Sequence, residues 1–472
     1  MLTYLPKYFT SKATSLYIGV LVLCNILFFN RFLSPLWWVF GLVEVISFFY
    51  FSNKLTRQWA DYSEKKFAKK LFQNALIIRI IWVIFSYFFF IYMTGNPFEY
   101  DAGDSIGYHR EASQLAAMMH EGNIQPWFRM VDMMKHGFSD MGYVFYLGCQ
   151  YFVTDSSIFI ERLFKALFSA FTCILIYRLA KRTFGEAVGR MSAIFCMLMP
   201  NLILYCGLHE KEVEMVFLAV LFMERVDALV RLRNFNIINI ALPILITIAL
   251  FSFRTVLGVT ALFALFTTLM FSTSKILGMG KRMILIIWVL VAAGYFIGGT
   301  IANEVENTWN DRNINQEQSL EFRATRENGN KFAKFAGGAV FAPMIFVIPF
   351  PTIIETPGQQ NQKIINGGNY VKNIMAFFAI FALYWVIKNK KWRDYLLIGS
   401  FLIGYLGIIA VSAFAQSERF HQPVLPFELA MAAFGLSLVT NREKKYFTWW
   451  TALIFIAIVG WSWFKLAGRN MV

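Results

Sequence analysis

Apolar segments of about bilayer-spanning length recur along the whole sequence, separated by short polar connections. A helix of about 20 apolar residues crosses the ~30 Å hydrocarbon core of a membrane. Hydrophobic residues make up 57% of the 472 residues and charged residues only 15%, a balance too apolar for soluble domains. The sequence therefore predicts an all-α polytopic membrane protein.

The apolar segments number about thirteen, and two longer segments of mixed character, 94–156 and 302–370, interrupt them. Within the second, residues 339–355 are apolar but short and contain three prolines, which favours an interfacial or re-entrant element over a full span. The predicted spans lie near residues 15–33, 35–52, 71–93, 157–180, 186–206, 212–230, 236–252, 255–272, 283–301, 371–388, 394–414, 423–440 and 447–466.

A dense basic run between residues 54 and 70 orients these helices, because loops rich in Lys and Arg stay on the cytoplasmic side. Each later basic cluster follows at the spacing that alternating spans require, and both long segments then fall outside the cytoplasm. The basic residues are Lys54, Arg57, Lys65, Lys66, Lys69 and Lys70, then Lys181 and Arg182, Arg231 and Arg233, Lys275, Lys281 and Arg282, Lys388, Lys390, Lys391 and Arg393, and Arg442, Lys444 and Lys445.

This pattern divides the chain into three parts. Residues 1–70 are predicted to form a helical hairpin with a basic cytoplasmic loop, 71–440 the core with its two extracytoplasmic loops, and 441–472 a C-terminal helix. Lys7 and Lys12 precede the first apolar segment without a small-residue cleavage site, so we expect this segment to be a membrane helix and not a cleaved signal.

Several classes of partner and site are disfavoured. The net charge of +15 does not indicate nucleic acid, because the basic residues lie in separate loops and form no single stripe. The five cysteines are scattered without a CxxC pair, so neither a disulfide framework nor a zinc site is expected. No Asn-x-Ser/Thr acceptor occurs, which favours a multi-pass protein of a bacterial inner membrane.

Ionisable side chains gather in the turns on the predicted outer side, and all five histidines lie there. Charges at so many turns of one face are explained by one polar cavity open to that face. Asp101 and Asp104 allow two interpretations. Asp104 and Ser105 could cap a helix running from Ile106 to Met119, or a carboxylate here could act as a general base near a lipid-linked substrate.

The segment Gly103–Ala112 resembles the acidic first-loop motif of GT-C-type membrane glycosyltransferases, in the branch of dolichyl-phosphate-mannose and aminoarabinose transferases. Residues 190–217 are similar to the next landmark of that family, a helix ending in Pro and an outer turn with an acid. Phe253–Thr255 resembles its Arg turn, and 418–427 its late Arg-Tyr-x-x-Pro entry into a helix. Ser105 stands where many relatives have a second acid, which disfavours a metal-binding acidic pair.

The resemblance implies a GT-C-like fold and a donor sugar carried on a polyprenyl phosphate or pyrophosphate within the membrane. It implies Asp104 as the base that activates an acceptor hydroxyl, with Asp101 and Glu99 as alternatives, and inversion at the sugar. The acceptor is left open as a lipid, a glycan or a protein. The residues expected to bind substrate are Tyr108, His109, His209, Lys211, Glu212, Arg254, Arg323, Arg326, Arg419 and His421.

No cofactor is expected with certainty, and a divalent metal is the less favoured alternative because His109, His209 and His421 come from separate turns. An O-antigen-type polymerase or ligase would depend more on Arg323, Arg326 and His421. A transporter or flippase of a lipid-linked substrate should show repeats, broken helices and charges inside its spans, whereas here the charges are expected at one face. A structural membrane scaffold is the remaining alternative.

Overall fold

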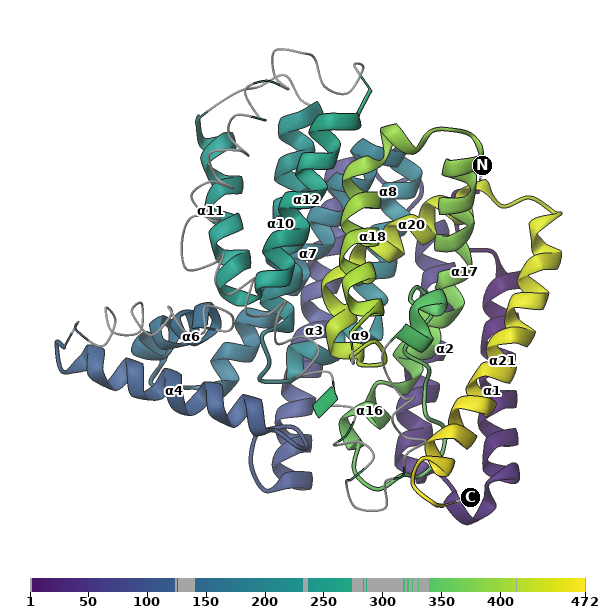
Figure 1. Cartoon of the computed structure of the whole chain (residues 1–472), viewed down its shortest axis with the longest axis horizontal. Helices are drawn as coiled ribbons and strands as arrows, with labels where there is room; N and C mark the ends of the chain where they lie inside the picture. The colour runs from purple at the N-terminus through teal and green to yellow at the C-terminus, as the bar shows by residue number, and fades with distance from the viewer. Residues whose placement is uncertain are drawn as a thin grey trace.

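The computed structural model describes residues 2–123, 141–231, 237–273, 339–412 and 414–471, with a few isolated positions between these ranges. Over these ranges the chain forms a bundle of helices, with two helices lying across one end (Figure 1). The described ranges contain no β-strand. The prediction of an all-helical, membrane-embedded protein is confirmed at this level.

Six helices are long and apolar enough to cross a membrane, and a bent pair raises the number to seven. Every predicted span coincides with a helix except 283–301, most of which lies outside the described residues, and several of these helices are shorter than a full crossing. The number of thirteen crossings therefore stays a prediction.

The six helices long enough to cross a membrane are α1 (Lys7–Leu27), α2 (Pro35–Gln58), α3 (Glu64–Thr94), α7 (Ile158–Phe184), α17 (Asn366–Lys388) and α21 (Glu443–Ala467). The bent pair is α8 (Glu186–Leu198) with α9 (Pro200–Leu204). The others used below are α4 (Gly103–His120), α6 (Met141–Thr154), α10 (Glu212–Arg231), α11 (Ile237–Phe253), α12 (Thr255–Phe271), α16 (Gln360–Ile364), α18 (Leu396–Ala410), α19 (Glu418–His421) and α20 (Leu425–Leu438).

The break between α8 and α9, a bend of 55°, falls at Pro200, which has no N–H to continue the helix. The Arg79 side chain of α3 donates to the carbonyls of Cys196 and Met197 at this break, both at 3.2 Å, and to Ser169 of α7 at 2.6 Å. Arg79 is fully buried. The expectation that charges lie only at one face is therefore wrong, and this charge satisfies backbone carbonyls inside the bundle.

Polar side chains also hold irregular backbone in the bundle. Residues 339–359 form a short 3₁₀ helix and an extended segment, not a spanning helix. Lys372 and Asn373 of α17 donate to carbonyls of this segment, and Asn366 pairs with both the amide and the carbonyl of Thr352. Because water is scarce in such a setting, backbone groups outside a helix need partners of this kind.

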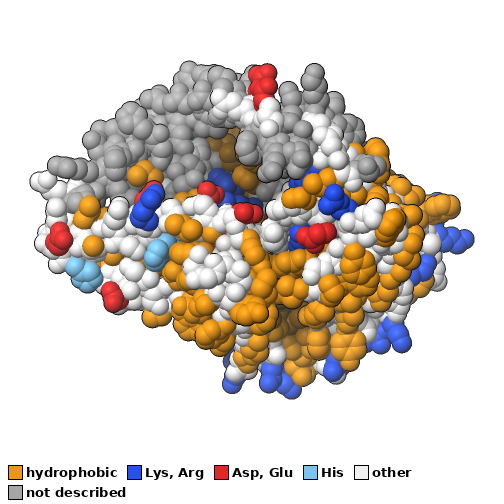
Figure 2. Space-filling model, turned by 90° about the horizontal axis from the view of Figure 1, so that it is seen from below, with side chains coloured by type: hydrophobic (Ala, Val, Ile, Leu, Met, Phe, Trp, Pro, Cys, Tyr) orange, Lys and Arg blue, Asp and Glu red, His pale blue; other side chains and the backbone are white. Residues whose placement is uncertain are grey.

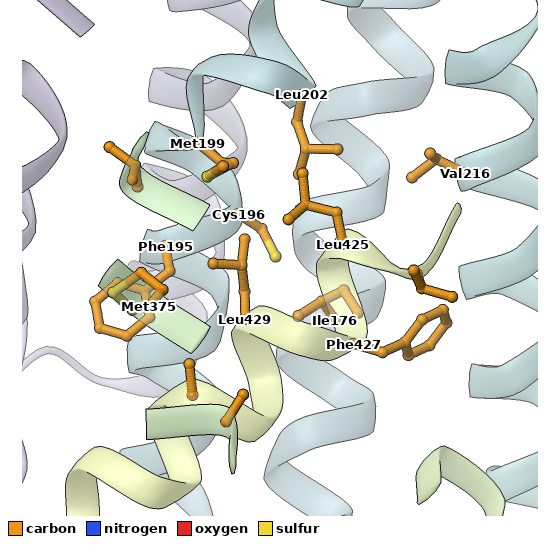
Figure 3. Packing of buried hydrophobic residues seen from close by; sticks show 14 of the residues in the cluster. Ile176, Phe195, Cys196, Met199, Leu202, Val216, Met375, Leu425, Phe427 and Leu429 are labelled. Atoms are coloured by element: carbon orange, nitrogen blue, oxygen red, sulfur yellow. The ribbon is translucent and has the colours of Figure 1, made fainter. Parts of the chain in front are cut away.

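The central core lies between α7, α8, α10, α17 and α20 (Figure 3). Ile176 of α7, Phe195 of α8 and Leu429 of α20 are buried there. Helices α17 and α20 approach so closely that a Cβ added at Gly435 would lie 1.9 Å from the carbonyl oxygen of Phe378. Small residues allow such contact between helices in membranes.

The two ends of the bundle carry different groups. Helices α4 and α6 lie across one end, near α16 and the segment before α10 (Figure 1). At the other end, Lys181 contacts Glu64 at 2.6 Å and Arg190 donates to the carbonyl of Trp59 at 2.8 Å. The turns with the predicted site residues therefore share one end, opposite the basic run.

Candidate functional site

Arg419 joins three segments that are distant in sequence. It lies in α19, and its Nη1 is 2.7 Å from Oδ2 of Asp104 in the first turn of α4. Its Nε donates to the carboxylate of Glu212 at the start of α10, and Glu210 Oε1 lies 3.6 Å from its Nη1. This guanidinium therefore holds α4, α19 and the turn before α10 together.

Two more cations lie beside Arg419. Lys211 is 1% exposed, and its Nζ donates to the carbonyl of Phe253 at 3.3 Å and lies 5.9 Å from the centre of the Tyr108 ring. Arg254 lies over the ring of Phe420, 4.4 Å from its centre, as cation–π pairs do. Its Nη1 is buried and has no hydrogen-bond partner among the described residues. A buried donor without an acceptor is costly, so this nitrogen favours an incoming anion.

The charges of the cluster do not balance. The cluster consists of Asp104, Glu210, Lys211, Glu212, Arg254 and Arg419. Burial, followed by the nearby charge of Arg254, lowers the pKa of Lys211 from its usual range to about 7. Burial opposes ionisation of Arg419, but the carboxylates of Glu212 and Glu210 outweigh it and raise the pKa of Arg419. Burial and the charge of Glu212 raise the pKa of Glu210 well above its usual range, which favours its neutral form. Below about pH 7, where Lys211 is protonated, the two carboxylates of Asp104 and Glu212 face three cationic side chains, and the excess positive charge suits an anionic ligand.

The cluster opens to the end of the bundle where α4 and α6 lie. Figure 2 views this end and shows Lys or Arg and Asp or Glu side chains together at a hollow near the middle of the face. The Asp104 side chain is 64% exposed, whereas that of Arg419 is 18% exposed. The acid therefore meets solvent while the cations lie deeper.

Asp104 lies in the first turn of α4 but does not cap this helix. Helix α4 begins at Gly103, its N-cap is Ala102, and no side chain caps it. Asp104 pairs with Arg419, and the buried Ser105 hydroxyl donates to Glu99. The capping interpretation is therefore wrong, and the carboxylate of Asp104 belongs to the cluster.

The two alternative acids occupy different positions. Glu99 is 3% exposed; it accepts the amide of His209 at 3.2 Å and lies 4.0 Å from Arg162. It therefore supports the site from behind and offers no open carboxylate. Asp101 is exposed in a left-handed backbone conformation, with φ of 50°, before α4.

The histidines are not gathered around the cations as expected. His209 is fully buried with its Nδ1 3.2 Å from Glu161, and His109 is half-buried with its Nδ1 2.8 Å from the Tyr151 hydroxyl. His421 is buried between Lys372 and the carbonyl of Ala415, at 2.7 and 2.9 Å. The expectation of substrate contact is thus corrected for His209 and His421, whose ring nitrogens already have buried protein partners.

Arg323 and Arg326 lie outside the described residues. Within the described ranges, no group of three or more His, Cys, Asp or Glu side chains could hold a metal ion. Asp104, Glu210 and Glu212 do approach one another, but Arg419 lies among them. A site for an anion therefore fits these residues better than a site for a cation.

Two members of the site were missed in the sequence. Glu210 was passed over between His209 and Lys211, and Phe420 because an aromatic residue is unremarkable in so apolar a chain. The signal for Phe420 was its position directly after Arg419. An aromatic ring that can form a cation–π contact, next to a residue predicted to bind phosphate, is a reason to include Phe420 in the site.

No family model, curated protein or solved structure matches the chain.

Proposed function

We propose that this protein is a membrane glycosyltransferase that moves a sugar from a polyprenyl-phosphate donor to an acceptor at the extracytoplasmic face. The observation that carries the proposal is an exposed carboxylate beside three cationic side chains, one buried and two partly buried, at one end of the bundle. Asp104 supplies the carboxylate, and Lys211, Arg254 and Arg419 supply the charge. The proposal includes a GT-C-like fold with about thirteen crossings, in a bacterial inner membrane.

The residues support a direct displacement. The acceptor hydroxyl oxygen forms a bond to the anomeric carbon as its proton passes to Asp104. The bond from that carbon to the phosphate oxygen breaks, and the lipid phosphate leaves with the electron pair. Arg254, with its buried unpartnered Nη1, and the ammonium of Lys211 stabilise the developing charge. Attack opposite the leaving group inverts the anomeric centre.

The first test asks whether the protein carries such a lipid. Native mass spectrometry of protein extracted directly from its membrane should detect a bound polyprenyl-phosphate species. Its absence, together with a failure of added polyprenyl phosphate to bind, contradicts the proposal.

The second test is catalytic. Asp104→Asn keeps the size of the side chain but removes the base, so release of polyprenyl phosphate from the donor should fall by about 10²- to 10⁴-fold. Glu111→Gln is the matched control, because Glu111 is an exposed acid on the same helix outside the cluster. Equal activity of Asp104→Asn and Glu111→Gln, with both folded, rules out Asp104 as the base.

A transporter of a lipid-linked substrate is the second candidate, and the 55° break between α8 and α9 favours it. Translocation of a fluorescent polyprenyl-phosphate sugar in vesicles, undiminished by Asp104→Asn, would support that candidate. A polymerase or ligase would instead lose activity on substitution of Arg323 or Arg326.

A further inference from the structure

Behind the cationic cluster, four side chains from four segments form a hydrogen-bonded series. His109 Nδ1 of α4 lies 2.8 Å from the hydroxyl of Tyr151 in α6, and this hydroxyl lies 3.4 Å from Nε2 of His209 in the turn before α10. His209 Nδ1 lies 3.2 Å from Oε2 of Glu161 in α7. Tyr151, His209 and Glu161 are fully buried, and only His109 reaches the partly exposed surface. The series thus runs from the α4–α6 hairpin to the bundle.

The same turn is held by two further side chains. Lys165 of α7 donates to the carbonyls of Leu208 and Glu210 at 2.8 and 2.6 Å, while Glu161 lies 2.7 Å from its Nζ. Glu99 accepts the amide of His209. The turn is irregular backbone in a buried place, so its polar groups need these partners. Lys211, the last residue of the turn, and Glu212, the first residue of α10, belong to the cationic cluster.

The Glu161 carboxylate can only accept, so His209 donates to it from Nδ1. In the tautomer of His209 that carries its single proton on Nδ1, Nε2 accepts from the Tyr151 hydroxyl, and the Tyr151 oxygen accepts from His109 Nδ1. One hydroxyl therefore connects the hairpin that carries Asp104 to the turn that carries Lys211.

We propose that Tyr151 and His209 are positioning residues, which fix the turn before α10 against the α4–α6 hairpin and so place Lys211 opposite Asp104. The meaning of this placement for catalysis rests on the proposed function, but the placement itself does not. Neither residue contacts the anion in this arrangement; both act through the turn.

The test uses a matched pair of tyrosines on α6. Tyr151→Phe keeps the ring and removes both hydrogen bonds, whereas Tyr146→Phe removes a buried hydroxyl that has no hydrogen-bond partner among the described residues. Hydrogen–deuterium exchange of the full-length protein in detergent is measured for peptides covering residues 205–212. Exchange there should rise about fivefold in Tyr151→Phe, equivalent to ~1 kcal/mol for one hydrogen bond, and not in Tyr146→Phe.

A second readout separates positioning from general loosening. If the turn loosens in Tyr151→Phe, water reaches Lys211 and raises its pKa towards the ordinary value. The pH above which polyprenyl-phosphate binding weakens should therefore rise. The groups whose charges act on Lys211 here are Arg254, Glu212, Arg419 and Asp104, and none of them is altered by the substitution. The pH midpoint should be unchanged in Tyr146→Phe.

Unchanged exchange at 205–212 in Tyr151→Phe, or an equal rise throughout both variants, would overturn the inference. If Tyr151→Phe does not fold, His109→Phe breaks the series at its half-exposed end and must raise exchange at 205–212 by a measurable factor. A wild-type protein that binds no polyprenyl phosphate contradicts the proposed function alone, since the exchange experiment needs no ligand.

Discussion

At the residue scale, Lys211 makes the site sensitive to pH near neutrality. Its folded pKa of about 7 lies below the ordinary value, so the ammonium is present below pH 7 and is lost as the pH rises through that value. Lys211→Gln removes this charge at every pH. Below pH 7 the wild type should bind polyprenyl phosphate about 10- to 100-fold more tightly than Lys211→Gln, and the difference should shrink above it.

The comparison of these two proteins isolates Lys211, because the ionisation of the phosphate itself is common to both. A bound anion raises the pKa of the ammonium, so the midpoint in the complex should lie at 7 or above. Binding measured by microscale thermophoresis between pH 6 and 9 provides the curve. A constant affinity ratio across this range would show that Lys211 does not titrate at the site.

Arg254 carries the second residue-scale prediction. Its buried Nη1 has no hydrogen-bond partner among the described residues, and its guanidinium lies over the ring of Phe420. Arg254→Ala should weaken donor binding more than Arg254→Lys, which keeps the charge but loses the planar fork. We expect at least tenfold for Ala, measured as KM for the donor. Arg110→Ala, an exposed cation on α4, is the control and should bind normally.

At this scale the sequence identified which residues share an end, but not which way they face. Asp104, Lys211, Glu212, Arg254 and Arg419 were predicted together because alternating spans place their turns on one side. The histidines lay on the same side and were therefore expected in the same cavity. Whether a side chain in a turn points to solvent or into the bundle depends on packing between helices distant in sequence, which one chain's periodicity does not contain.

At the element scale, the approach of α17 and α20 determines how the core closes. A side chain at Gly435 would meet the carbonyl of Phe378, whereas a Cβ at Gly399 of α18 meets nothing within 4 Å. Gly435→Leu should therefore separate the two helices and destabilise the fold by ~1–3 kcal/mol or more through overpacking. This loss should appear as a lower melting temperature in detergent. Gly399→Leu should melt near the wild type. Equal melting of both variants would contradict close packing at Gly435.

The existence of most helices was predictable from apolar length, because crossing a bilayer leaves little choice of backbone structure. The break at Pro200 was implied only by the resemblance, as a helix ending in Pro, whereas the predicted span 186–206 runs through it as one apolar segment. What keeps the break tolerable is Arg79, more than a hundred residues earlier in the sequence. No local pattern around either residue announces that pairing.

At the scale of the whole molecule, the two ends differ in charge. The end with α4, α19 and the turn before α10 carries the candidate site, and the other carries the basic run near Lys65 and its contacts with Lys181 and Arg190. Loops rich in Lys and Arg resist translocation, so the basic end should be cytoplasmic. Assigning one end to the cytoplasm therefore places the other end outside, because α7 runs from Glu161 beside His209 to Lys181 at the basic end.

Cysteine labelling tests this orientation. In a Cys149→Ser background the remaining native cysteines are buried, so they should not react. A membrane-impermeant maleimide applied to intact cells should label Glu111→Cys on α4 and should not label Lys65→Cys or Lys391→Cys until the membrane is permeabilised; all three positions are exposed. Labelling of Lys65→Cys in intact cells would show that the protein has the opposite orientation in the membrane. Asp104 and its cations would then face the cytoplasm, where a lipid-linked donor for extracytoplasmic transfer does not reach them.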